Sequence, residues 1–228
     1  HAVRFVLPIS CHCGNSIPFV PGSSISMLTT NSLLRSWLVA VFLSCHGASA
    51  VAETIAQRTL ANGLKVIVKE DHRSPVAVSM VWYRAGSMDE VSGTTGVAHM
   101  LEHMMFKGTQ KVTVGEFSRT IGRAGGRENA FTSRDYTAYH EQLHKSRLPL
   151  ALELEADRMV NLSLAGDEFS KELKVVMEER RSRTDDNPHS QLHEQLMASV
   201  YLSHPYRSPV IGWMNDLQNM QLADARGW

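Results

Sequence analysis

The fold and function of the chain can be interpreted from one stretch, Val97-Ala-His-Met-Leu-Glu-His-Met-Met-Phe106. His99 and His103 are four residues apart, so a helix places them on one face, one turn from each other. Two imidazoles at that spacing can bind one Zn²⁺ at about 2.0–2.1 Å. Glu102 projects near the same face, where its carboxylate can accept a proton from water that the metal activates. The stretch therefore predicts a zinc-binding helix with its own general base.

A second interpretation of this stretch is a helix whose two histidines are half-buried against the core. The residues around Glu102 are otherwise apolar, and a carboxylate in such a segment is costly to bury without a partner. The pairing of two histidines with this glutamate therefore favours the zinc site.

A catalytic zinc ion needs a third protein ligand and one open position. The segment Glu172–Glu179 is expected to be helical, and its positions 172, 175, 176 and 179 form one stripe that reads Glu, Val, Val, Glu. We expect the two valines to point inward, which turns Glu172 and Glu179 toward the interior. Glu178 lies about 100° round the helix and should face the solvent. The alternative is that both inward glutamates only cover the rim of the core.

The pattern of the chain around these segments predicts an α+β fold, a mostly antiparallel sheet with helices packed on it. Asn62-Gly63 indicates a tight turn within a hairpin over Thr59–Lys69, and Thr113-Val-Gly-Glu116 fits a capping box that begins a helix. That helix should stop at Gly125-Gly126. The other expected strands cover residues 76–83 and 127–142, and the other expected helices cover 148–160, 167–183, and stretches from about 190 and about 223, with a turn at 185–188.

The first fifty residues have the pattern of processing segments. Residues 27–50 fit a secretory signal peptide, because Arg35 precedes a short apolar run that ends at Ala48-Ser-Ala50. We therefore expect residues 1–26 to be upstream sequence and 51–228 to be an exported domain, either periplasmic or secreted. A buried amino-terminal helix and lipid attachment at Cys45 are the alternatives. The apolar run is too short to cross a bilayer, so the mature domain should have no membrane span.

Charge and cysteine content exclude several other functions. The formal net charge is zero and there is no long basic run, which argues against nucleic acid as a partner. The three cysteines are Cys11, Cys13 and Cys45, so a disulfide framework or a Cys-ligated zinc site is excluded after residue 45.

From about Thr59 to the end, the chain resembles the pitrilysin, insulinase and mitochondrial processing peptidase family, whose zinc motif is the inverted HxxEH. The resemblance rests on the motif at 99–103, on Glu179 and on several flanking phrases. These phrases are Phe106-Lys-Gly-Thr109, Gly125-Gly126, Asn129-Ala-Phe-Thr132, Tyr136-Thr-Ala-Tyr139, Val175-Val-Met-Glu-Glu-Arg180, His204-Pro-Tyr206 and Ile211-Gly212.

The resemblance implies a zinc endopeptidase that holds one Zn²⁺ per chain through His99, His103 and Glu179. Glu102 would be the general base and Glu172 a second carboxylate supporting the site. Extended peptides or unfolded polypeptides would pair with an edge strand that carries the substrate-binding residues Asn129, Ala130 and Phe131.

The resemblance also implies a partner. Members of the family enclose the substrate between two homologous halves, whereas this chain corresponds to a first half that is incomplete at its carboxyl terminus. A second half would be fused or supplied as a separate subunit, and residues 51–228 alone are expected to be inactive. The rival functions are a non-catalytic scaffold subunit of a peptidase-like complex and a zinc-binding protein without turnover. The complete set of metal ligands and Glu102 argues against both.

Overall fold

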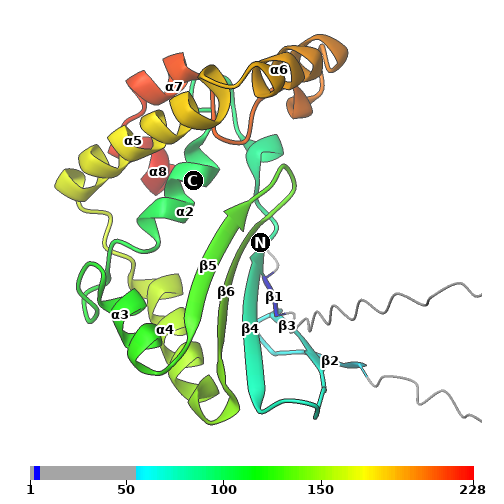
Figure 1. The fold of residues 1–228 in the computed structure, drawn as a ribbon, viewed down its shortest axis with the longest axis vertical. Helices are drawn as coiled ribbons and strands as arrows, with labels where there is room; N and C mark the ends of the chain where they lie inside the picture. Colours follow the sequence, from blue (N-terminus) through cyan, green and yellow to red (C-terminus); the bar gives the residue numbers. More distant parts are fainter. Residues whose placement is uncertain (1–2, 6–54) are drawn as a thin grey trace, which may run out of the picture. The chain divides into compact units, whose positions relative to one another are not determined.

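The computed structural model describes residues 3–5 and 55–228 (Figure 1). The predicted signal peptide at 27–50 and the three cysteines lie outside the described residues, so the division into residues 1–26, 27–50 and 51–228 stays a prediction.

Six strands form one sheet, and its order is β2-β3-β1-β4-β6-β5. Every neighbouring pair is antiparallel except β1 and β3, which run parallel. The mostly antiparallel sheet of the predicted α+β fold is thus confirmed. The strands are β1 Val3–Phe5, β2 Ile55–Thr59, β3 Lys65–Lys69, β4 Val76–Tyr83, β5 Arg127–Thr132 and β6 Thr137–His144.

The first predicted hairpin is confirmed, since β2 and β3 pair across the Asn62-Gly63 turn. The backbone N–H of Leu64 donates to Asn62 Oδ1 at 3.1 Å, and Gly63 adopts a φ of +86°, which glycine reaches without strain.

The prediction of one strand over residues 127–142 is wrong, because the chain folds back as the hairpin β5–β6. Thr132 pairs with Thr137, and the backbone N–H of Ser133 donates to the carbonyl of Tyr136 at 2.8 Å to close the turn. The polar residues Ser133 and Asp135 favour this reversal. The hairpin places β5 at the outer edge of the sheet.

Seven helices accompany the sheet in the described residues. They are α2 Val97–Met104, α3 Glu116–Arg123, α4 Leu148–Asn161, α5 Gly166–Arg180, α6 Pro188–Val200, α7 Met214–Asn219 and α8 Leu222–Gly227. A π-helical turn, Arg181–Asp185, extends α5 toward α6. The sequence patterns anticipated all of these helices except α7.

The helix α3 is where expected, but the predicted capping box is absent. Its N-cap is Gly115 with a φ of +75°, and no side chain caps it. The carboxylate of Glu116 instead forms ion pairs with Arg119 and Arg123 one and two turns along the helix. The helix ends as predicted, since Gly125 adopts a φ of +74°.

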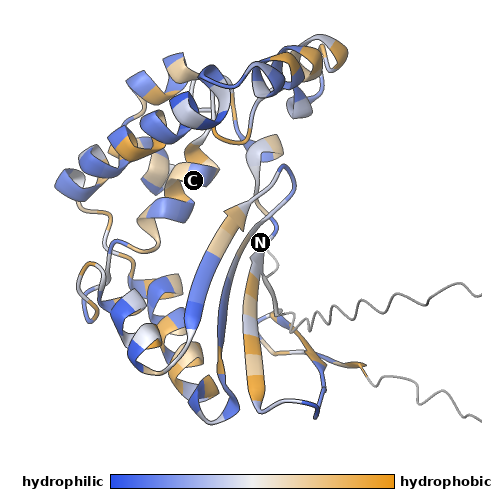
Figure 2. Ribbon diagram, viewed as in Figure 1, coloured by the Kyte–Doolittle hydropathy of each residue, from blue (hydrophilic) through white to orange (hydrophobic). Residues whose placement is uncertain are grey.

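Two buried apolar clusters lie in the part of the chain that the structure describes. Figure 2 shows apolar residues alternating with hydrophilic ones along the helices that contribute to them. One cluster joins α3, α4 and β6 through Phe117, Ile121, Leu143, Ala151 and Leu154. The other joins α2 to α5, α7 and α8 through Met100, Met104, Phe169, Val176 and Leu217, among others. The second cluster fixes the position of the predicted zinc-binding helix.

A buried charged group lies between β6 and α4. The guanidinium of Arg158 is 3.2 Å from Glu141 and also pairs with Glu155, and all three side chains are almost fully buried. It lies over the rings of Phe117, Tyr139 and Phe106 at 4.4, 4.6 and 5.0 Å. Burial and the neighbouring carboxyl of Glu155 raise the pKa of Glu141 to about 10, so its carboxyl is neutral at pH 7.

We predict that Glu141 makes the protein less stable as pH rises. Its folded pKa is raised from 4.5 to about 10, so the native state holds a proton that the unfolded chain has released. The stabilisation that comes from this proton is complete at pH values below the pKa of Glu141 in the unfolded chain. It is lost as the pH rises through the pKa of Glu141 in the folded protein. In Glu141→Gln the free energy of unfolding should fall less with pH, by up to about 1.4 kcal/mol per pH unit between about pH 5 and pH 8. Urea unfolding at several pH values measures this slope. Glu153→Gln, at an exposed position of α4, should keep the wild-type slope; a wild-type slope in Glu141→Gln as well would contradict the assignment.

Candidate metal centre

The helix α2 is held at its amino terminus by a close crossing of two backbones. Gly96 and Gly212 both adopt positive φ, +90° and +88°. A Cβ at Gly96 would lie 2.6 Å from the carbonyl oxygen of Ile211, and one at Gly212 would lie 2.4 Å from that of Thr95. Only glycine fits at both positions, which explains the Ile211-Gly212 phrase in the sequence.

The carboxylate of Glu90 caps this helix in place of an N-cap side chain. It accepts hydrogen bonds from the backbone N–H groups of Gly96 at 2.8 Å and Ala98 at 2.9 Å. Burial raises the pKa of Glu90 to about 7, although both backbone hydrogen bonds favour the ionised form. Glu90 therefore positions the residue immediately before His99.

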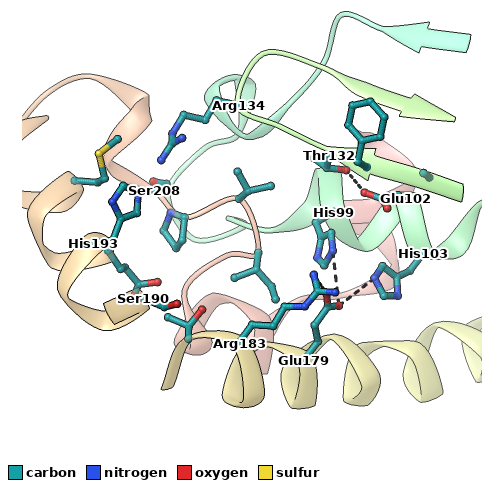
Figure 3. A pocket seen from close by; sticks show the side chains of 18 of the residues that line it. His99, Glu102, His103, Thr132, Arg134, Glu179, Arg183, Ser190, His193 and Ser208 are labelled. Carbon is teal, nitrogen blue, oxygen red and sulfur yellow. Dashed lines mark hydrogen bonds and ion pairs between the residues drawn. The ribbon is translucent and has the colours of Figure 1, made fainter. Parts of the chain in front are cut away.

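The predicted ligands His99, His103 and Glu179 lie together where α2 packs against α5 (Figure 3). One possible ligand atom from each residue lies within 4.8 Å of the other two. Glu179 Oε2 is 3.3 Å from His103 Nε2 and 3.8 Å from His99 Nε2. Two imidazole nitrogens and one carboxylate oxygen are a donor set that zinc accepts, so the residues present fit the ion.

The carboxylates of Glu172 and Glu179 both contact the imidazole of His103 and change its pKa. Its Nδ1 is 2.9 Å from Glu172 Oε1, and Glu172 also pairs with Lys107 at 2.5 Å. Burial opposes the charged form, but the hydrogen bonds to Glu172 and Glu179 raise the pKa of His103 to about 9. The bond from Glu172 to Nδ1 fixes the ring so that Nε2 faces Glu179, the arrangement by which outer residues orient metal ligands.

His99 has the opposite electrostatic environment. Burial, followed by the charge of His103, lowers the pKa of His99 to about 4. Its imidazole is therefore neutral at pH 7, which is the form that binds metals. On the other side of the ligand group, Arg183 contacts Glu179 Oε1 at 2.5 Å and leaves Oε2 toward the two histidines.

Glu102 lines the same pocket as the three candidate ligands, and this pocket has a volume of about 1010 Å³. The hydroxyl of Thr132 donates a hydrogen bond to Glu102 Oε2. Burial raises the pKa of Glu102, even though the bond from Thr132 and the charge of His103 favour the carboxylate. A carboxylate with a raised pKa accepts a proton more readily than an exposed one.

The predicted substrate residues Asn129, Ala130 and Phe131 line this pocket from the edge strand β5. Ser133 and Tyr136 form a hydrogen-bonded pair of the antiparallel hairpin, so the alternation of the ladder turns the N–H of Ala130 toward the outer edge, where it donates to Asn129 Oδ1 at 2.9 Å. The outer edge of β5 thus presents backbone groups to the pocket.

The stripe predicted on α5 is found with one difference. Val176 is fully buried, Glu172 is 8% exposed, and Glu178 lies on the solvent face with 71% of its side chain exposed. Val175 is half exposed, contrary to the inward orientation that we expected, because α5 borders the pocket on that side.

Three residues near the centre were not anticipated as site residues. Thr132 belongs to the quoted Asn-Ala-Phe-Thr phrase, which was a signal that could have identified it. Lys107 belongs to the quoted Phe106-Lys-Gly-Thr109 phrase, which was a similar signal, but no local pattern indicates its ion pair with Glu172 of α5. Glu90 lies in the loop before α2, six and eight residues ahead of the N–H groups that it caps, and no pattern at the start of the helix indicates this contact.

Residues 65–212 match the sequence profile described as insulinase (peptidase family M16). The chain belongs to this family. Among curated relatives of this M16 chain, the zinc protease PqqE of Helicobacter pylori is 41% identical over 194 residues, which cover 83% of this chain and 44% of that protein. The chain thus spans less than half the length of this relative.

Two solved structures are similar to this chain in fold. A protease from Helicobacter pylori superposes with a TM-score of 0.75 at 41% identity, covering 77% of this chain and 42% of that chain. The first half of the periplasmic protease PqqL from Escherichia coli superposes with a TM-score of 0.66 at 24% identity, covering 76% of this chain and 38% of that chain, and shares the fold.

Within residues 3–5 and 55–228, the helices of the M16 chain are too short or too polar to span a membrane.

We predict that Glu179→Ala loses bound zinc, whereas Glu178→Ala keeps it. The two residues are adjacent, but only the first places a carboxylate oxygen beside both histidines; the second pairs with Arg181 at the surface. Zinc per chain after dialysis, measured by atomic emission, decides this. Equal zinc loss in both variants would show that α5 presents a different face to the metal.

Proposed function

We propose that this chain is the metal-bearing half of a zinc endopeptidase, with one Zn²⁺ per chain held by His99, His103 and Glu179. The observation that carries the proposal is the convergence of these donors within 4.8 Å, in a pocket that also holds the carboxylate of Glu102. The name of the Helicobacter relative, a zinc protease, supports the same ion and reaction class.

Zinc bound at this centre would lower the pKa of a water molecule and polarise the carbonyl of the scissile peptide bond. Glu102 accepts the proton from the attacking water and delivers it to the amine that leaves. Thr132 holds one oxygen of Glu102, which leaves the other oxygen for this transfer. Glu172 and Lys107 keep His103 oriented throughout, so Glu172 is a positioning residue for the reaction.

The substrate in this proposal is an extended or unfolded polypeptide. The edge strand β5 can pair with a peptide main chain, and Asn129, Ala130 and Phe131 would contact its backbone and side chains. Pairing of this kind holds the scissile carbonyl at a fixed distance from Glu102, which accounts for much of the rate in such reactions.

The partner in this proposal is a second homologous half, fused or separate. The superposition on the first half of the Escherichia coli protease, and the 44% share of the Helicobacter relative, support it. The signal-peptide pattern at 27–50 supports export to the periplasm or beyond, and the Escherichia coli structure is described as that of a periplasmic protease. A non-catalytic scaffold subunit is the second candidate, and the placement of Glu102 beside the ligands argues against it.

We predict that Glu102→Gln binds zinc normally and cleaves peptides about 10²–10⁴-fold more slowly in the full-length gene product, because an amide cannot accept the proton. Zinc content and cleavage of an unstructured fluorogenic peptide are the measurements. Glu178→Gln is the matched control and should keep wild-type turnover. Full turnover of zinc-loaded Glu102→Gln would remove this residue from the mechanism.

We also predict that residues 51–228 alone bind zinc but cleave peptides poorly, because the metal does not by itself hold the peptide in line. Correct positioning accounts for about 7–11 kcal/mol of such barriers. Activity should return when the second half, or a partner chain that carries it, is added. Rapid, chelator-sensitive cleavage by purified 51–228 would mean that a second half is dispensable.

A further inference from the structure

The pocket beside the metal centre is lined by acidic and cationic residues, and the proposed reaction does not use all of them. The acidic residues are Glu102, Glu179 and Glu194. The first is bonded to Thr132, and the second is surrounded by the histidines and Arg183. Glu194 is held by two hydrogen bonds from the buried guanidinium of Arg180, at 2.8 and 2.9 Å. Every carboxylate of the pocket is therefore already paired.

The cationic residues of the pocket are Arg134, Arg183 and Arg207. Arg183 pairs with Glu179, and Arg207 is exposed and donates to the carbonyl of Leu202 at 3.2 Å. Arg134 differs from both, because its guanidinium has no hydrogen bond or ion pair with any residue that the structure describes. Its Nε is buried without a partner.

Two backbone hydrogen bonds and one ring contact fix Arg134 in this position. The backbone N–H groups of Ser87 and Met88 donate to the carbonyl oxygens of Ser133 and Arg134 at 3.1 and 2.9 Å, which anchors the β5–β6 turn. The guanidinium lies 5.5 Å from the ring centre of Tyr206.

The hydroxyl of Tyr206 in turn donates to Asp135 Oδ1 at 2.6 Å. Although Asp135 is next to Arg134 in the sequence, its carboxylate is directed to Tyr206, and no ion pair joins it to the guanidinium among the described residues. Figure 3 shows Arg134 reaching into the pocket from the hairpin turn, on a different side from Glu179 and Arg183.

We infer that Arg134 binds a carboxylate of the peptide substrate and so gives the enzyme a preference for acidic peptides. This inference rests on the proposed peptidase function and names part of its specificity. A guanidinium presents a rigid fork of N–H donors that matches the two oxygens of a carboxylate. Because the side chain is already held by Tyr206 and the anchored turn, little ordering is needed when the substrate binds.

Two sources can supply this carboxylate, namely an acidic side chain near the scissile bond or the carboxyl terminus of the peptide. Binding distinguishes them. The protein is the zinc-loaded, full-length Glu102→Gln variant, which should not consume the peptide. The probe is an unstructured, fluorescently labelled peptide without other charges, in which each position is replaced in turn by Glu, Gln or Lys, with a free or an amidated carboxyl terminus.

We expect one position at which Glu binds about tenfold more tightly than Gln, with Lys weaker still. If the carboxyl terminus is the source, amidation should cause the same loss instead. Adding Arg134→Gln should abolish the difference and leave the Kd of the uncharged peptide unchanged. Arg134→Glu should prefer Lys at the same position. Arg147→Gln, at an exposed position outside the pocket, should retain the wild-type preference.

Three results would overturn the inference. The first is equal affinity for the Glu and Gln peptides, whether the carboxyl terminus is free or amidated. The second is an equal loss of affinity for all peptides in Arg134→Gln. The third is no binding of any peptide. The proposed function is tested separately, with the wild-type residue at 102. If that protein binds the acidic peptide but does not cleave it, the peptidase proposal fails and the role of Arg134 stands.

Discussion

The packing of α2 against α5 is the constraint on which the candidate centre depends. Neither helix can supply three zinc ligands by itself, because only residues three or four apart share a face within one turn. Met100 and Met104 on α2 meet Phe169 and Val176 on α5 in one buried cluster. This apolar contact sets the distance at which Glu179 faces the two histidines, so the metal centre is a consequence of core packing.

Charged and buried residues around the centre set the protonation and orientation of its ligands. The carboxylates of Glu172 and Glu179 raise the pKa of His103, whereas burial lowers the pKa of His99 and keeps it neutral. Lys107 and Arg183 neutralise the outer oxygens of the same carboxylates. Burying polar groups without partners is costly, and these ion pairs and hydrogen bonds reduce that cost for the carboxylates. The network therefore orients the ligand atoms and limits the charge gathered beside them.

Sequence patterns predicted the parts of the molecule that depend on local spacing. The 99–103 motif, the inward faces of Glu172, Val176 and Glu179, and the outward face of Glu178 all follow from helical periodicity. The Asn62-Gly63 hairpin follows from turn chemistry. The resemblance to a known family extended these local patterns to the whole fold and to the residues of β5.

Errors arose where contacts between distant segments decide the structure. The hairpin of β5 and β6 looked like one strand, because its turn at Ser133 and Asp135 lies within a continuous run of strand-forming residues. Val175 is half exposed because that side of α5 borders the pocket. The contacts of Glu90 with α2, and of Arg134 with Tyr206, join segments whose proximity no local pattern indicates.

The central claim is that zinc is held by two imidazoles and a carboxylate from α2 and α5. X-ray absorption at the zinc edge of the zinc-loaded protein tests it most directly. We expect nitrogen and oxygen ligands at about 2.0–2.1 Å, with the multiple-scattering signature of two histidines. A sulfur ligand at about 2.3 Å, or the signature of one or no histidine, would contradict the account.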